Sequence, residues 1–169
     1  VFVFCLFVIS GCDVTYNLNI DKYYDENLNF VKKSNRNSIN EDMFLFDDIK
    51  DRFNLGIPLD VDGDGENYDS QLIEDGNDVG FILNGRFKSD NSKSYIISEA
   101  CDKYSISKKG SRVSLVASNF NVFDDYDDLD FITINISSHY KVLQNNADSV
   151  NDNVYTWIIT RDNFYERDV

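Results

Sequence analysis

The sequence contains one histidine, one proline and three cysteines in 169 residues, and these shortages exclude several classes of protein. A single His cannot build a His-rich zinc site, and the Cys residues lack the paired spacing of zinc ribbons and disulfide frameworks. Basic residues are also few, because 16 Lys and Arg stand against 30 Asp and Glu, which gives a net charge of −14. Such a charge repels phosphates, so we expect no nucleic-acid partner.

Glu, the acidic residue that favours helix interiors, is scarce: 24 of the 30 acidic residues are Asp and only six are Glu. Asp, Asn and Ser favour turns and caps over helix interiors, so the composition indicates more strand than helix. We predict one α+β domain, in which a mainly antiparallel sheet with long hairpins packs against one or two helices.

Alternating apolar residues mark the expected strands. Val14, Tyr16, Leu18 and Ile20 follow the two-residue period of a strand with one buried face, and residues 132–136 repeat that pattern. Further strands are expected at residues 28–30, 79–87, 112–117, 140–143 and 154–159, with the start of another at 164–169. The best helix is predicted over residues 38–53, where apolar residues recur at helical spacing, and a short one over 93–104.

The chain begins with nine apolar residues, which are fewer than the roughly 20 that a membrane-spanning helix needs. They resemble the core of a signal peptide, and Ile9-Ser10-Gly11-Cys12 follows in the order of a bacterial lipobox. We therefore interpret residues 1–11 as a signal-peptide remnant and residues 12–169 as a single extracytoplasmic domain. The Cys12 thiol would carry diacylglycerol and anchor this domain to the cell membrane, facing the exterior. The alternative is a buried structural Cys12.

Two clusters of residues add to this interpretation: the run from Gly11 to Ile20, and Asn145-Asn146-Ala147-Asp148 followed by Tyr155-Thr156-Trp157. The pattern resembles LppM-type bacterial lipoproteins. The resemblance implies an envelope lipoprotein with an α+β ectodomain, often followed by a transmembrane helix, and a role in binding envelope lipids or glycolipids. It implies no catalytic residues. We expect that the reading frame continues beyond both ends of this sequence.

Asp60, Asp62 and Asp64 match the first three ligands of a calcium loop, with Gly65 at the turning position. The second half departs from the pattern, since Gln71 stands where a bidentate Glu is required. A solvated acidic turn is the simpler interpretation, and a weak extracellular calcium site is the alternative. No other cofactor is expected.

No nucleophile motif accompanies the lone His139, so the sequence favours a non-enzymatic protein. We expect a surface module that binds an envelope lipid, glycolipid, glycan or protein partner, in a groove between the sheet and the helix at 38–53. A surface hydrolase that uses paired carboxylates stays open as an alternative, as does a structural module with weak calcium binding. Cys101 is expected to be a small buried residue.

Overall fold

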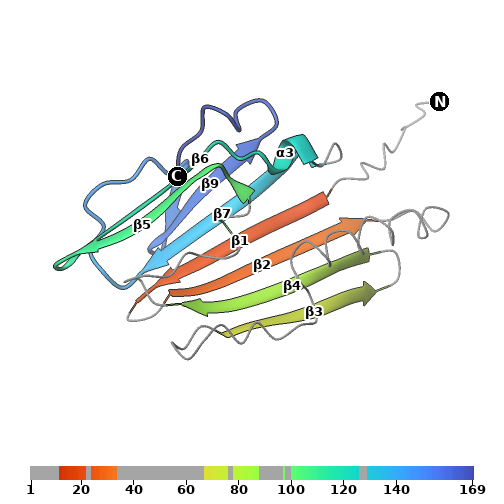
Figure 1. The fold of residues 1–169 in the computed structure, drawn as a ribbon, viewed down its shortest axis with the longest axis horizontal. Helices are drawn as coiled ribbons and strands as arrows, with labels where there is room; N and C mark the ends of the chain where they lie inside the picture. Colours follow the sequence, from red (N-terminus) through yellow and green to blue (C-terminus); the bar gives the residue numbers. More distant parts are fainter. Residues whose placement is uncertain are drawn as a thin grey trace, which may run out of the picture.

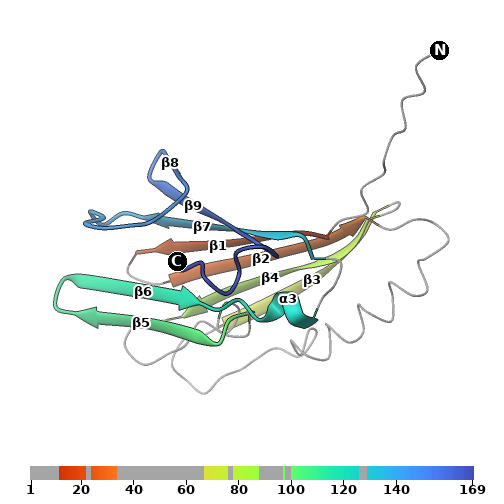
Figure 2. The same cartoon turned by 90° about the horizontal axis from the view of Figure 1, so that it is seen from above.

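The computed structural model describes residues 12–21, 24–33, 67–75, 78–87, 97, 100–125 and 129–169. These residues form a twisted seven-stranded sheet, and a two-stranded hairpin with a short helix lies on one side of it (Figures 1 and 2). The side that carries the hairpin is called the covered face. No described element packs on the other side, which is called the open face.

The sheet has the strand order β3-β4-β2-β1-β7-β9-β8. Neighbouring strands are antiparallel except for β1 and β7, which are parallel although they lie far apart in the sequence. The strands are β1 (Cys12–Ile20), β2 (Tyr24–Lys33), β3 (Asn67–Asp75), β4 (Asp78–Phe87), β7 (Phe131–Ser138), β8 (Ser149–Asn151) and β9 (Val154–Thr160).

The core lies under the covered face, and it is built by the alternation that the sequence predicted. Successive side chains of a strand point to opposite faces, so every second residue of β1 and β7 is buried there. Trp157 and Ile159 of β9 continue the same face. The central buried side chains are Val14, Tyr16, Leu18, Ile20, Leu28, Phe30, Ile132, Ile134, Trp157 and Ile159.

The second layer is the hairpin of β5 (Lys103–Lys109) and β6 (Arg112–Ser118), joined by Gly110 and Ser111. Gly110 has a φ of 63°, which suits the first central position of a type II′ turn. The C-terminal segment lies beside β6 in this layer. The backbone N–H of Val169 donates to the carbonyl oxygen of Ala117, and the N–H of Ala117 donates to the carbonyl oxygen of Val169. The helix α3 (Val122–Asp125) follows β6.

The predicted α+β class is wrong, because the described structure is mostly β-sheet and its one bounded helix has four residues. No helix among the residues described packs along the sheet; the hairpin takes that place. Tyr104, Ile106, Val113 and Leu115 alternate and pack against the core, so the two-residue period of β5 and β6 determined the outcome. The predicted helix at 38–53 lies outside the described residues.

Other boundaries differ in detail. The strands expected at 14–20, 79–87, 112–117, 132–136 and 154–159 are confirmed, whereas β3 was not predicted and β2 starts earlier, at Tyr24. In the region expected to form a short helix, Ile97 and Ala100 are helical but Lys103 already begins β5. Residues 140–143 do not extend a strand. Residues 161–166 form turns, and Asp168 makes only an isolated bridge to Ser118.

Candidate functional site

The open face carries a row of polar side chains that crosses five neighbouring strands. The register places Asn17 of β1 beside Asn27 of β2 and Asn135 of β7. Asn84 of β4 and Thr156 of β9 extend this row at its two ends. We call these five residues the amide row. Asn is depleted in strands, so its recurrence at one register position on four adjacent strands is unusual for a solvated face.

The side chains of the amide row form one continuous chain of hydrogen bonds. Thr156 Oγ1 donates to Asn135 Oδ1 at 2.8 Å, and Asn135 Nδ2 donates to Asn17 Oδ1 at 3.0 Å. Asn17 Nδ2 donates to Asn27 Oδ1 at 3.1 Å, and Asn27 Nδ2 donates to Asn84 Oδ1 at 2.8 Å. An amide has two N–H groups and two lone pairs, so each internal Asn keeps one donor and one acceptor for another partner.

A second polar row lies beside the first, on the side away from Cys12. Ser137 Oγ donates to Asn19 Oδ1 at 3.1 Å, and Arg86 Nε donates to Asp25 Oδ1 at 2.5 Å. The four Asn of the amide row and the residues of the second row line an open depression of about 570 Å³. Its lining holds polar groups from β1, β2, β4 and β7, with Val154 of β9 at one side.

The depression is close to electrically neutral in a strongly acidic chain. The carboxylate of Asp25 pairs with the guanidinium of Arg86, and both lie on the open face. Glu26 is the next residue along β2, but its side chain lies on the covered face, where it is 2% exposed and accepts a hydrogen bond of 2.9 Å from Tyr16. Two adjacent carboxylates that point to opposite faces cannot act on one bond, so Asp25 and Glu26 do not form the paired acids of a glycosidase.

The open face becomes more apolar toward Cys12. Phe131 and Ile158 lie on this face, two and one same-face register positions beyond the amide row, and they are 40% and 46% exposed. Val31, Ile73 and Ile82 of β2, β3 and β4 share that half of the face and are partly buried. We call these five residues the apolar band. The half of the face nearer Cys12 therefore mixes these apolar side chains with polar ones such as Thr15, Asn29 and Thr133, whereas the other half is polar.

The residues predicted to form a site from the sequence are not brought together. Cys12 is the first residue of β1, whereas Ile9, Ser10 and Gly11 precede the described part of the chain. Asp60, Asp62 and Asp64 also lie outside it, so weak calcium binding stays a prediction. Among the residues that the structure does describe, no three His, Cys, Asp or Glu are placed to hold a metal ion.

Cys101 is buried, as predicted, and lies in the core beneath the covered face. Its Sγ is 3.2 Å from the carbonyl oxygen of Ile97. Burial raises the pKa of this thiol from 9.0 to about 11, because the thiolate would lose its hydration. The group is therefore an unreactive thiol at neutral pH. His139 is exposed in the segment that follows β7.

The second cluster of the resemblance, residues 145–148 and 155–157, hydrogen-bonds to the C-terminal segment. Trp157 Nε1 donates to Asn146 Oδ1 at 3.0 Å, and Asn146 Nδ2 donates to the carbonyl oxygen of Asp168 at 2.9 Å. The Asp148 carboxylate accepts from the backbone N–H of Ile158 at 2.8 Å and pairs with Arg167. These contacts give the cluster a structural role, and the bond to Ile158 occupies a part of the β9 edge that β8 does not pair.

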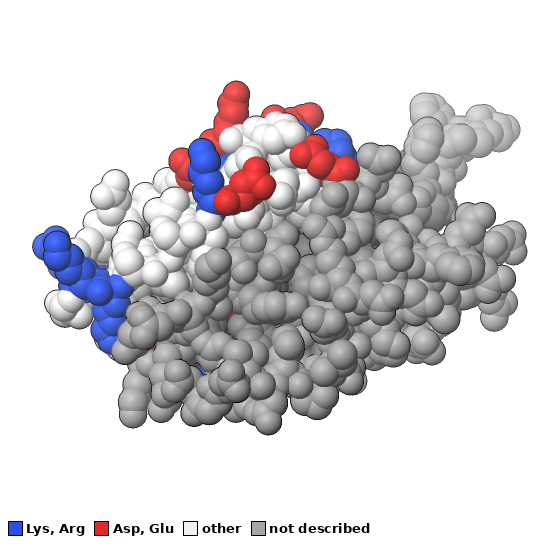
Figure 3. Space-filling view, viewed as in Figure 1, with Lys and Arg blue, Asp and Glu red and all other residues white. Residues whose placement is uncertain are grey.

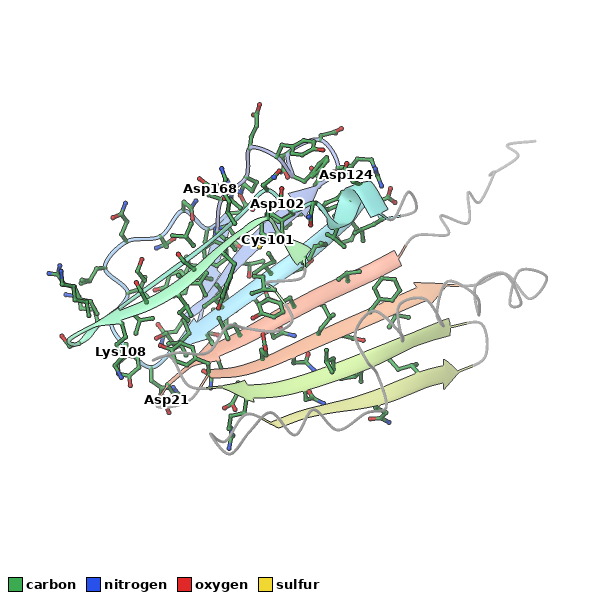
Figure 4. The ribbon with its side chains drawn as sticks, in the orientation of Figure 1. Asp21, Cys101, Asp102, Lys108, Asp124 and Asp168 are labelled. Carbon is green, nitrogen blue, oxygen red and sulfur yellow. The ribbon has the colours of Figure 1, made fainter. Side chains whose placement is uncertain are left out.

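Acidic residues gather at the base of the hairpin, where Figure 4 labels Asp102 and Asp124. Asp102 accepts hydrogen bonds from the side-chain amides of Asn119 and Asn121. Asp124 accepts a hydrogen bond of 2.8 Å from the hydroxyl of Tyr165, and this bond raises the pKa of Tyr165 above its ordinary value. This network ties α3 and the C-terminal segment to the start of β5.

A comparison with known proteins finds no family model, curated protein or solved structure that matches the chain. The resemblance to LppM-type lipoproteins therefore stays a prediction that rests on the residues quoted above. In the described part of the chain, no helix has both the length and the apolar character to span a bilayer.

Sequence reasoning missed the amide row as a site. Thr15, Asn17 and Asn19 alternate with the apolar residues of the first predicted strand, and Thr133 and Asn135 with those of the strand predicted at 132–136, which marks them only as the polar side of each strand. Their alignment depends on the parallel pairing of β1 with β7, which joins residues 118 positions apart in the sequence. The signal that could have found them is the repeated Asn at alternate positions of several predicted strands.

Proposed function

We propose that this chain is the extracytoplasmic module of a bacterial lipoprotein, anchored through Cys12, and that it binds an envelope glycolipid without catalysing a reaction. The anchor rests on the apolar run and the tetrapeptide that ends at Cys12. The fold is compatible with it, because β1 begins at Cys12 and so leaves no linker between the anchor and the sheet. Two acyl chains on Cys12 would hold the module at the membrane surface.

The amide row is the observation that carries the binding role. Sugar hydroxyls are both donors and acceptors, and the row offers one unused donor and one unused acceptor on each internal Asn. Strands lie about 4.8 Å apart, so these groups recur at a spacing similar to the length of a sugar ring. The Arg86–Asp25 pair cancels its own charge, which favours an uncharged headgroup over a phosphorylated one.

The apolar band supports an amphipathic ligand. Phe131 and Ile158 lie between the amide row and the end of the sheet where Cys12 begins β1. With the anchor at that end, the apolar band faces the bilayer and the polar rows face away from it. A glycolipid standing in the same membrane would then present its acyl chains to the band and its sugar to the row.

The separation of Asp25 and Glu26 supports the absence of catalysis. A carboxylate-dependent hydrolase needs two acids that converge on one bond, and these two point to opposite faces of the sheet. We therefore prefer a binding module to the hydrolase alternative.

The anchor is tested by expressing the full reading frame in a bacterium that is fed an alkyne-labelled fatty acid. The wild-type protein is expected to take up the label and to partition into detergent, and Cys12→Ala should do neither. Cys101→Ala is the matched control, because it removes a cysteine that burial keeps unreactive. Equal labelling of wild type and Cys12→Ala would overturn the anchor.

The binding role is tested by flotation with phosphatidylcholine vesicles that contain a neutral diglycosyl diacylglycerol, using the unacylated domain. The double variant Asn17→Ala/Asn135→Ala should lower binding at least tenfold, since it removes the centre of the amide row. Gln144→Ala, which removes an exposed amide elsewhere, should bind as the wild type does. Binding that does not depend on the sugar, or that survives the double variant, would contradict the proposal.

A further inference from the structure

The β5–β6 hairpin has a charge opposite to that of the chain as a whole. Residues 103–118 contain four of the 16 basic residues and none of the 30 acidic ones. They also contain five serines. The net charge of −14 therefore arises elsewhere, and the hairpin is a separate cationic, hydroxyl-rich element.

The register of the hairpin places most of these groups on its outer side; Lys108 shares the register of Ile106 but is exposed at the tip, and Ser118 is buried. Tyr104 and Ile106 pack inward against the core, so the residues that alternate with them point away from the sheet. Lys109 is paired with Arg112 across the turn, and Ser107 with Ser114 one step further from it. All four side chains are exposed.

Among the described residues, no Asp or Glu forms an ion pair with the cations of the hairpin tip, although Asp21 lies at the same end of the molecule (Figure 4). Neither Lys108, Lys109 nor Arg112 forms an ion pair with a residue in the described part of the chain. Figure 3 shows Lys and Arg atoms at the end of the molecule that holds the tip, and Asp and Glu atoms gathered at the top of the same view. Figure 4 places Lys108 at the tip, far along the hairpin from Asp102 and Asp124.

We propose that the outer side and tip of the β5–β6 hairpin form a docking surface for a phosphate-bearing linear polymer of the cell envelope. The guanidinium of Arg112 can hold a phosphate by two hydrogen bonds, and Lys108 and Lys109 add point charges beside it. Ser107 and Ser114 supply hydroxyl donors on the same side. The closely spaced cations match the repeating charge of a phosphodiester chain.

The position of the tip favours a polymer over lipid headgroups. β1 runs from Cys12 toward the end of the sheet where the tip lies, as both ribbon views show (Figures 1 and 2). Nine residues of strand span about 30 Å, which is several Debye lengths at physiological salt. The preference for a polymer over lipid headgroups rests on the proposed anchor at Cys12. The cationic character of the hairpin does not depend on that anchor. The same screening limits the repulsion that distant acidic residues exert on a polymer at the tip.

The test measures binding of the unacylated domain to inorganic polyphosphate by fluorescence anisotropy, over a range of salt concentrations. About three neutralised phosphates predict that the logarithm of the affinity falls with the logarithm of salt with a slope near −2 to −3. Lys109→Glu/Arg112→Glu should reduce the affinity at least tenfold and flatten the slope by about two. Lys141→Glu/Arg161→Glu, whose residues lie outside the hairpin, changes the net charge equally and should leave the affinity within threefold of the wild type.

Four outcomes would overturn the proposal. The first is an equal loss of polyphosphate affinity in the two double variants, and the second is binding of polyglutamate as strong as that of polyphosphate. The other two are tighter binding to phosphatidylglycerol vesicles, or to single-stranded DNA of equal charge, than to polyphosphate. Retained sugar-dependent flotation in Lys109→Glu/Arg112→Glu would show that this variant is folded, so failure here and failure of the glycolipid role are distinguishable.

Discussion

The covered and open faces of the seven-stranded sheet are built from alternate residues of the same strands, yet different interactions order them. On the covered face, Leu18 and Ile134 are each 1% exposed and pack in an apolar core. On the open face, Asn17 and Asn135 stand one residue away from them and are joined by side-chain hydrogen bonds. Burial of apolar area stabilises the first face, whereas the second gains only the small net energy of hydrogen bonds made in reach of water.

The difference separates stability from function. Large side chains on the covered face fix the fold, and their replacement should unfold the protein. The polar side chains of the open face should each contribute less to folding than the buried core, and we propose that a ligand accounts for their regular arrangement. The predictions below change one face at a time, beginning with the largest expected effect.

Neighbouring substitutions on β7 should give the largest contrast. Ile134→Ala removes a fully buried side chain and is expected to lower the free energy of unfolding by about 2–5 kcal/mol. Thr133→Ala, one residue away on the open face, should change it by about 0.5 kcal/mol or less. Urea unfolding followed by tryptophan fluorescence measures both, since Trp157 is buried beside Ile134. Similar losses in the two variants would show that a further part of the chain covers the open face.

The buried thiol under the covered face predicts a pH effect. The pKa of Cys101 is about 11 in the folded protein against 9.0 in the unfolded chain, so the unfolded chain releases its proton first as the pH rises. The contribution of this thiol to the free energy of unfolding should therefore fall between pH 9 and pH 11, by at most about 2.7 kcal/mol, and should be constant below pH 8.

The measurement compares urea unfolding of wild type and Cys101→Ala at pH 7.5 and pH 10.5. The variant lacks this proton and should lose less stability between the two values, although its stability at pH 7.5 is also lower. Identical pH dependence in both proteins would mean that the thiol is hydrated in the folded state.

The same contrast explains what the sequence could predict. The alternation of Val14, Tyr16, Leu18 and Ile20 is a local pattern, so β1 and its buried side followed from it directly. The predicted α+β class was wrong because the alternation in β5 is short, so the sequence pattern indicates a strand over Arg112 to Ala117 but not the hairpin that covers the sheet. The amide row could not be predicted, because it is defined by register between strands that are distant in the sequence.

Removing one member of the amide row should have a moderate effect on stability. Asn17 donates one hydrogen bond and accepts another, so Asn17→Ala is expected to cost about 1–2 kcal/mol. A double-mutant cycle with Asn135→Ala should give a coupling energy of about 0.5–1 kcal/mol, because the two side chains share a bond. The matching cycle of Asn17→Ala with Gln144→Ala should give none. Additive losses in the first cycle would mean that the row is not connected in solution.

The smallest effect on stability is expected at the ion pair on the rim of the depression. The side chains of Arg86 and Asp25 are 56% and 42% exposed, so water screens their attraction, and Arg86→Gln should change the free energy of unfolding by about 0.5 kcal/mol or less. Its effect on binding should be larger, since Asp25 would become an unpaired negative charge beside the amide row. Flotation with the glycolipid vesicles should weaken, and Asp25→Asn in the same protein should restore it by removing that charge. Loss of stability equal to that of Ile134→Ala would place the pair among the groups that hold the fold, and the open face would then no longer differ from the covered one.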